Sequence, residues 1–174
     1  MRKEAYLALY TGVYSRPWLA KALAVISTVI TYITVAVYGL FLGYLLYKDL
    51  LYKDTVRGLQ FLAVTATPFV IVTLMRRIIN APRPYEVIEC EALAPLSEVG
   101  RKGSSFPSRH MASSFIVGSS LCFICLPAGI AVMSLGILLG FCRVALGRHF
   151  LRDVIVGGVI GGIAGTVGML ITMI

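Results

Sequence analysis

The sequence predicts an all-α integral membrane protein, a helical bundle of about five transmembrane helices plus an N-terminal interfacial helix. Hydrophobic residues make up 58% of the 174 residues and the mean hydropathy is +0.87, as in chains that fold in lipid. Charged residues contribute only 14%, and they cluster between long apolar runs. The length favours a single domain, 1–174, whose motif core spans 76–153.

The first segment, 1–17, predicts a short amphipathic helix at the membrane interface. It has basic ends and carries Tyr6, Tyr10 and Tyr14 at four-residue spacing. The next apolar run is too long for the core of a signal peptide, so we expect it to remain as an uncleaved span. The five predicted spans are 18–47, 58–75, 111–126, 128–141 and 154–174.

Glycine and cysteine patterns within the spans indicate packing. Gly157, Gly161 and Gly165 recur at four-residue intervals, which lets a neighbouring backbone approach closely. Cys122 and Cys125 have C-x-x-C spacing, but inside an apolar run they are interpreted as small packing residues.

Basic residues crowd at one face of the predicted bundle. Alternating the spans places 13 of the 16 Lys and Arg residues on one side, and only Lys48, Lys53 and Arg57 on the other. The net charge of +8 alone fits nucleic acid, anionic lipid or an anionic substrate. Because the charges lie at a membrane face, we expect a lipid partner and no nucleic acid. Such crowding normally marks the cytoplasmic side.

Three short segments on this face hold both histidines and a set of arginines. Arg76, Arg83 and Arg143 lie at span ends. The planar guanidinium of an arginine carries N–H donors that match phosphate oxygens, so these three residues predict a site that binds an anion. Pro107 and Ser108 open the predicted third span, whose free N–H groups also favour an anion. The Ser108 hydroxyl can serve as a helix cap, contact a phosphate, or do both.

His149 and Asp153 are four residues apart. We expect them on one helical face, with the carboxylate holding one ring nitrogen so that the other can attack. The alternative is an Asp153 that only stabilises a helix N-terminus. Two histidines and a carboxylate could also bind a metal, but the arginines would repel a cation and stabilise a phosphate. No metal and no cofactor is therefore expected.

These residues resemble the three motifs of the type 2 phosphatidic acid phosphatase superfamily of membrane lipid phosphatases. The K-x6-R-P, P-S-G-H and S-R-x5-H-x3-D motifs correspond to Arg76, Arg83 and Pro84, to Pro107 through His110, and to Cys142, Arg143, His149 and Asp153. Arg76 replaces the motif's Lys, Arg109 its Gly and Cys142 its Ser. The departures at Arg109 and Cys142 leave the substrate preference open.

The resemblance implies a role for each matching residue. Arg76, Arg83 and Arg143 would bind phosphate, helped by Ser108 and by the N–H of Arg109. His149, oriented by Asp153, would form a phosphohistidine, and His110 would protonate the leaving oxygen. Water would then hydrolyse the intermediate without a metal.

The function predicted from these features is hydrolysis of a lipid phosphate or diphosphate, such as phosphatidylglycerophosphate, phosphatidate, an isoprenoid diphosphate or a lipid A phosphate. A non-catalytic protein that binds or transports anionic lipids is the alternative. Vanadate-dependent oxidation, known in larger soluble relatives, does not fit this hydropathy. The resemblance favours a site on the extracytoplasmic face of a bacterial cell membrane, whereas the crowding of basic residues favours the cytoplasmic face. We expect residues 85–102 to form a lid, and the oligomeric state stays open.

Overall fold

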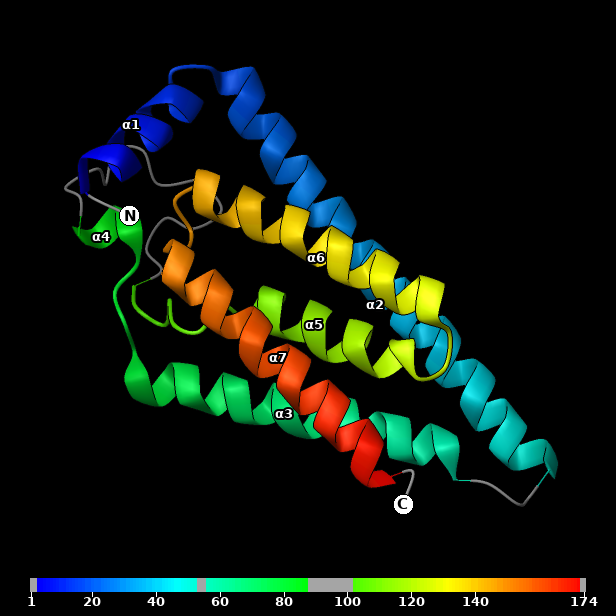
Figure 1. Ribbon diagram of the computed structural model, residues 1–174. Helices are drawn as coiled ribbons and strands as arrows, with labels where there is room; N and C mark the ends of the chain where they lie inside the picture. The colour runs from blue at the N-terminus through cyan, green and yellow to red at the C-terminus, as the bar shows by residue number, and fades with distance from the viewer. Residues whose placement is uncertain (1–2, 53–55, 88–101, 173–174) are drawn as a thin grey trace.

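Helices are the only regular elements among residues 3–52, 56–87 and 102–172, which the computed structural model describes (Figure 1). Their bounds are α1 Lys3–Tyr14, α2 Pro17–Tyr52, α3 Arg57–Ile79, α4 Pro84–Val87, α5 Arg109–Cys122, α6 Leu126–Ala145 and α7 Leu151–Thr172. The predicted all-α membrane bundle is confirmed.

Four segments of the described chain are long and apolar enough to cross a membrane: α2, the 57–87 segment that holds α3 and α4, α6, and α7. The third predicted span, 111–126, corresponds to α5, which is shorter than expected. Its 14 residues rise only about 21 Å, less than a hydrocarbon core of about 30 Å. It ends at Cys122, and Pro127 belongs to the first turn of α6.

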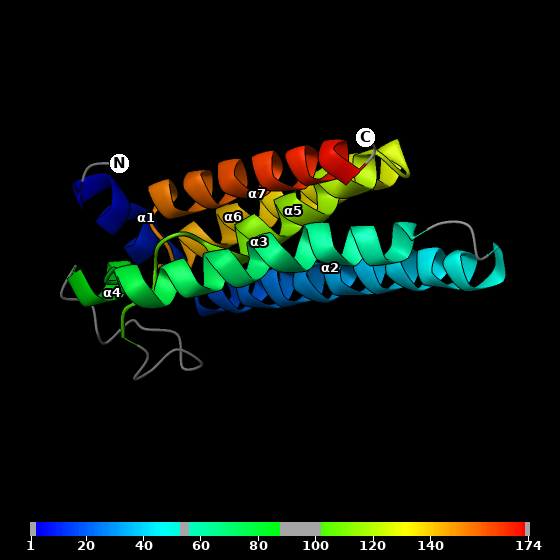
Figure 2. The same cartoon turned by 90° about the horizontal axis from the view of Figure 1, so that it is seen from below.

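The α5 helix lies at the centre of the bundle, where it packs against α3, α6 and α7. Figure 2 shows it between the pair α2 and α3 on one flank and α7 on the other. Lipid therefore meets mainly the outer helices. Only 17% of the α2 span is buried within the chain, and α2 has 36 residues, six more than the predicted 18–47 run.

The glycines of α7 allow its backbone to lie directly on α5. A Cβ atom at Gly157 would lie 2.5 Å from the carbonyl oxygen of Ser108, and one at Gly165 would lie 2.6 Å from that of Ile116. Gly161 meets the carbonyl of Ala112 in the same way. The predicted close backbone approach is present, and it sets the position of the α5 N-terminus.

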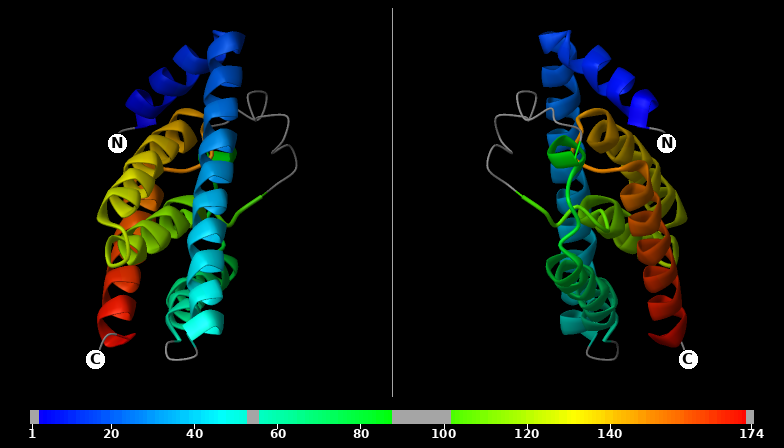
Figure 3. Two further views of the ribbon diagram at one scale, coloured as in Figure 1. Left: turned by 90° about the vertical axis from the view of Figure 1, so that its right-hand side faces the viewer. Right: turned by 90° about the vertical axis from the view of Figure 1, so that its left-hand side faces the viewer.

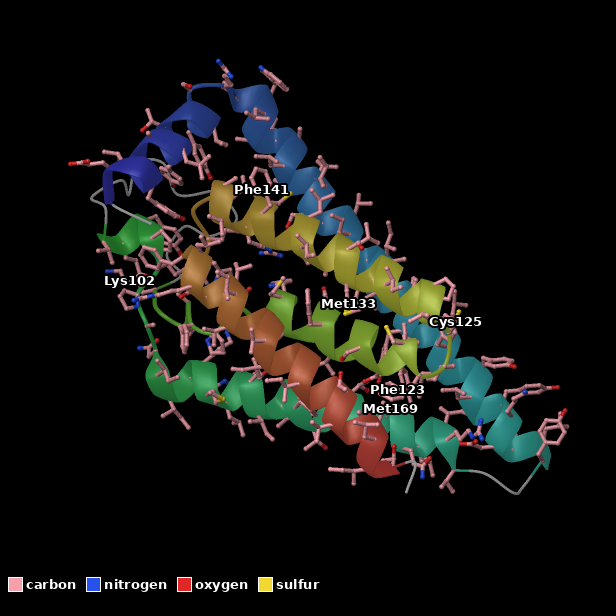
Figure 4. All side chains as sticks on the ribbon, viewed as in Figure 1. Lys102, Phe123, Cys125, Met133, Phe141 and Met169 are labelled. Atoms are coloured by element: carbon pink, nitrogen blue, oxygen red, sulfur yellow. The ribbon has the colours of Figure 1, made fainter. Side chains whose placement is uncertain are left out.

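One end of the bundle collects the polar segments. The helix α1, the helix α4, the C-terminal ends of α3 and α6, and the N-terminal ends of α5 and α7 gather there, and the C-terminus lies at the other end (Figures 1 and 3). Lys102 marks the polar end in Figure 4, whereas Cys125 and Met169 mark the opposite end.

The tyrosine face of α1 packs against the connection between α6 and α7. The buried Tyr6 hydroxyl lies 3.1 Å from the carbonyl oxygens of both Val144 and His149 and donates to them. Tyr14 donates to the Leu146 carbonyl at 3.3 Å. The Tyr10 ring fills the space beside Gly147, whose φ of +70° favours glycine. The expected tyrosine stripe thus supports the loop that carries His149, and its place at the membrane interface stays a prediction.

Replacing Gly157 by alanine is expected to destabilise the protein by about 1–3 kcal/mol, because the new methyl group overlaps the Ser108 carbonyl. Gly162→Ala is the matched control on the same helix, since its Cβ would meet only Phe115 at 3.7 Å. Thermal unfolding in detergent should separate the two variants. Equal unfolding temperatures would contradict the close packing of α7 on α5.

Candidate active site

The end of α3 holds the loop that precedes α5. Asn80 terminates α3 in the left-handed conformation with φ 43°, and its N–H donates to the Arg76 carbonyl. Its side-chain Oδ1 accepts a hydrogen bond of 3.1 Å from the Ser104 N–H. The N–H of Ser105 donates to the Ala81 carbonyl at 2.9 Å. The first two predicted motif segments are therefore in direct contact.

Two of the predicted phosphate-binding arginines also clamp this loop. The Nη1 atom of Arg76 donates to the Pro107 carbonyl at 2.8 Å, and its Nη2 atom donates to the Ser104 carbonyl. The Nε atom of the buried Arg83 donates to the Gly103 carbonyl at 3.1 Å. The planar guanidinium of Arg76 can donate to two carbonyls at once, which the ammonium group of a lysine cannot do with the same geometry. The arginine at position 76 therefore also stabilises the loop.

Glu86, part of the predicted lid, contributes to the same loop. Its Oε1 atom accepts hydrogen bonds from the N–H groups of Arg83 and Gly103, at 3.0 and 2.8 Å. Residues 88–101 of the predicted lid, including Glu89, Glu91 and Glu98, lie outside the described residues.

His149 lies in the turn before α7, with only 2% of its surface exposed. Its Nδ1 atom is 2.8 Å from the Ser105 carbonyl oxygen. A carbonyl can only accept, so in the neutral ring Nδ1 carries the proton and Nε2 presents its lone pair. This is the tautomer that a nucleophile attacking through Nε2 requires.

Asp153 contacts the His149 ring less directly than expected. The two do not share a helical face, because α7 begins at Leu151 and leaves His149 outside it. The distance from His149 Nδ1 to Asp153 Oδ2 is 3.8 Å, which is too long for a hydrogen bond. Oδ2 also accepts the Phe150 N–H at 3.0 Å, so Asp153 does stabilise the helix N-terminus as well.

Ser105 is the residue that links His149 to Asp153, and the sequence interpretation gave it no role. Its carbonyl accepts the His149 Nδ1 proton, while its buried hydroxyl donates to Asp153 Oδ2 at 2.6 Å. A serine in a loop has no periodicity or spacing that would single it out. Its position beside the Pro107–His110 motif was the only available signal.

Ser108 and His110 present buried polar atoms at the start of α5. Ser108 precedes the helix, but its hydroxyl makes no cap hydrogen bond. The Ser108 Oγ and His110 Nδ1 atoms are both buried and have no hydrogen-bond partner within the described part of the chain. The Ser108 N–H donates to the Asp153 carbonyl at 2.9 Å, which ties α5 to α7.

The arginine charges act on both imidazole rings. Burial lowers the pKa of His149, and the charges of Arg76 and Arg83 lower it further, against the opposing effect of Asp153. Burial and the charges of Arg143, Arg109 and Arg76 lower the pKa of His110 from 6.5 to about 2. Without a bound anion, burial and these charges therefore favour the neutral form of both rings. The same positive field would stabilise a phosphate placed between them.

Two further arginines lie beside these residues. Arg148 is 9% exposed, and its N–H donates to the carbonyl of Arg143, itself 8% exposed, at 3.0 Å. Arg152 is largely exposed and lies 3.6 Å from Asp153 Oδ1. The sequence interpretation gave no role to Arg148, a buried arginine next to His149 in the chain. Among the described residues, no cluster of three or more His, Cys, Asp and Glu residues could hold a metal ion.

Comparison with known proteins gives a family match and two similar folds. The model of the PAP2 superfamily matches residues 57–173. The crystal structure of the first transmembrane PAP2-type phosphatidylglycerolphosphate phosphatase from Bacillus subtilis is similar with a TM-score of 0.70 and 22% identity, over 98% of this chain and 85% of that one. Aquifex aeolicus LpxE is similar with a TM-score of 0.60 and 24% identity, over 94% of each chain. No curated protein sequence matches.

Ser105→Ala is expected to lower the turnover number about 10- to 150-fold, because the buried Asp153 carboxylate loses a charge-assisted hydrogen bond worth roughly 1.5–3 kcal/mol. Phosphate release from a lipid phosphate by the purified protein measures this. Ser119→Ala is the control, since that buried hydroxyl bonds only within α5. Equal activity of the two variants would show that the Ser105 hydroxyl does not support the site.

Proposed function

The chain belongs to the PAP2 superfamily, and from this premise we propose that it is an integral membrane phosphatase that releases phosphate from a lipid. The observation that supports this best is the buried His149, whose Nδ1–H bonds to the Ser105 carbonyl so that Nε2 is left with a lone pair. Arginine charges surround this ring at the polar end of the bundle. A lipid phosphate can enter this field while its chains stay between the helices.

The proposed reaction has two steps. First, His149 Nε2 attacks phosphorus, the bond to the lipid oxygen breaks, and that oxygen takes a proton from His110. Second, a water molecule attacks the phosphohistidine and gives its proton back to His110, which releases inorganic phosphate and neutral His149. Arg76, Arg83 and Arg143, with Ser108 and the N–H of Arg109, would stabilise the charge on the phosphoryl oxygens.

His110 must carry a proton when the substrate is bound, although its pKa is about 2 in the empty site. A phosphate dianion supplies two negative charges beside the ring and offsets the arginines that lower this pKa. Alternatively, the substrate enters as a monoanion and brings the proton itself. In either case the proton for the leaving oxygen is available only when the substrate is bound.

The alternative, a protein that only binds or moves anionic lipids, would need the arginines but not the histidines. It gives no reason for a fixed His149 tautomer or for a serine that joins the ring to a buried carboxylate. We therefore favour catalysis. The substrate would be phosphatidylglycerophosphate, phosphatidate, an isoprenoid diphosphate or a lipid A phosphate, hydrolysed without a metal, so that a chelator such as EDTA should leave the rate unchanged.

His149→Ala is expected to lower phosphate release at least about a thousandfold for every substrate, because the nucleophile is lost. His110→Ala should do so for lipid phosphates but much less for p-nitrophenyl phosphate, whose leaving group needs little protonation. Arg77→Gln, which changes an exposed arginine at the same end of α3, is the control. Trapping ³²P on the wild-type chain would identify the intermediate. Binding of lipid phosphate without release would instead support the alternative.

The pH profile of kcat/KM is expected to fall on the acid side, with this acid limb below pH 6.5. The neutral His149 ring is the nucleophile, and its lowered pKa keeps it neutral as the pH falls. Arg76→Gln removes a charge that lowers this pKa, so the acid limb should move to higher pH, whereas Arg76→Lys should leave it in place. Ionisation of the substrate is the same for both variants and cannot produce this difference. If the acid limbs of the Arg76→Gln and Arg76→Lys profiles coincide, the assignment of this limb to His149 is contradicted.

A further inference from the structure

A cavity of about 470 Å³ extends from the candidate active site into the bundle between α2, α3 and α5. Its walls include Tyr38 of α2, Phe69 of α3 and Val117 of α5, and the side chains of Arg109 and His110 line the same space. The cavity therefore joins an apolar interior to the two residues that begin α5. Such a space suits an amphipathic molecule with an anionic head.

The proposed mechanism fixes which part of the substrate lies in this cavity. His149 attacks phosphorus from the side opposite the leaving oxygen, and His110 protonates that oxygen. The leaving group consequently lies on the His110 side. Since His110 lines the cavity, the lipid that leaves would enter it, and Arg109 lines the same cavity.

Arg109 is placed to bind an anion there. Its guanidinium lies over the Phe69 ring, 5.9 Å from the ring centroid. A cation–π contact of this kind holds the guanidinium near the ring without using its N–H donors. No carboxylate of the described residues forms an ion pair with Arg109, and its side chain is exposed. The motif that the chain otherwise matches has glycine at this position, so the guanidinium is an addition to the basic site.

We propose that Arg109 binds a second phosphate group carried by the leaving lipid, an inference that rests on the proposed function. The substrate class is then a lipid with two phosphates, and only the terminal one is transferred. Two chemistries provide this arrangement: the inner phosphate of an isoprenoid diphosphate and the phosphodiester of a phosphatidylglycerophosphate. A phosphatidate or an isoprenyl monophosphate lacks the second anion.

The test compares kcat/KM within two matched substrate pairs in detergent micelles. The pairs are farnesyl diphosphate with farnesyl monophosphate, and phosphatidylglycerophosphate with phosphatidate of the same acyl chains. The wild-type protein, Arg109→Gln, Arg109→Lys and the control Arg77→Gln are measured with all four substrates. Because the second phosphate is held in both the ground state and the transition state, the effect should lie mainly in KM.

In at least one pair, Arg109→Gln should reduce the preference for the two-phosphate substrate by about tenfold, as expected for one lost charge-assisted contact. Arg109→Lys should restore part of it, and Arg77→Gln should leave it unchanged. The pair that responds identifies which second phosphate Arg109 contacts. If Arg109→Gln lowers kcat/KM equally for the two members of each pair, or lowers it for none of the four substrates, the inference is overturned. The phosphatase assignment would then remain intact. If the wild-type protein releases phosphate from none of the four, the inference is overturned, and if it also fails with a lipid A phosphate, the proposed function is overturned too.

Discussion

The hydrogen bonds around residues 103–108 hold the three parts of the site together. This loop receives the guanidinium groups of Arg76 and Arg83 on one side and the His149 ring on the other. Backbone carbonyls accept most of these hydrogen bonds, so the loop can hold the arginines and the His149 ring with few side-chain contacts of its own. A phosphate would meet positive groups whose directions are already fixed by these carbonyls, which lowers the cost of ordering them on binding.

Helix packing places this loop with the accuracy that the chemistry needs. The short helix α5 begins directly after the loop, and the glycine face of α7 lies against its backbone. The bond from the Ser108 N–H to the Asp153 carbonyl then links the beginning of one helix to the first turn of the other. Bulky residues at this contact would separate Ser105 from Asp153. The small residues of the membrane interior and the polar contacts of the site are thus parts of one arrangement.

Periodicity and residue chemistry predicted the helical membrane bundle, the glycine contact and the gathering of Arg76, Arg83, Arg143 and both histidines at one end. They did not predict Ser105, whose carbonyl is as important as its hydroxyl, because a backbone acceptor leaves no mark in a sequence. The direct contact of Asp153 with His149 was expected from a four-residue spacing that assumes a helix, yet the helix starts two residues after His149. The length of α5 was overestimated because an apolar run does not show where a buried helix turns.

Buried arginines near two imidazoles create a site that is incomplete without its ligand. Burial and the positive charges lower the pKa of both rings when no anion is present, which would suit a nucleophile and would not suit an acid. A bound phosphate dianion changes this balance most strongly at the ring closest to its leaving oxygen. In the proposed mechanism the two histidines differ in protonation while a substrate lies between them, so a single arginine field would serve both roles.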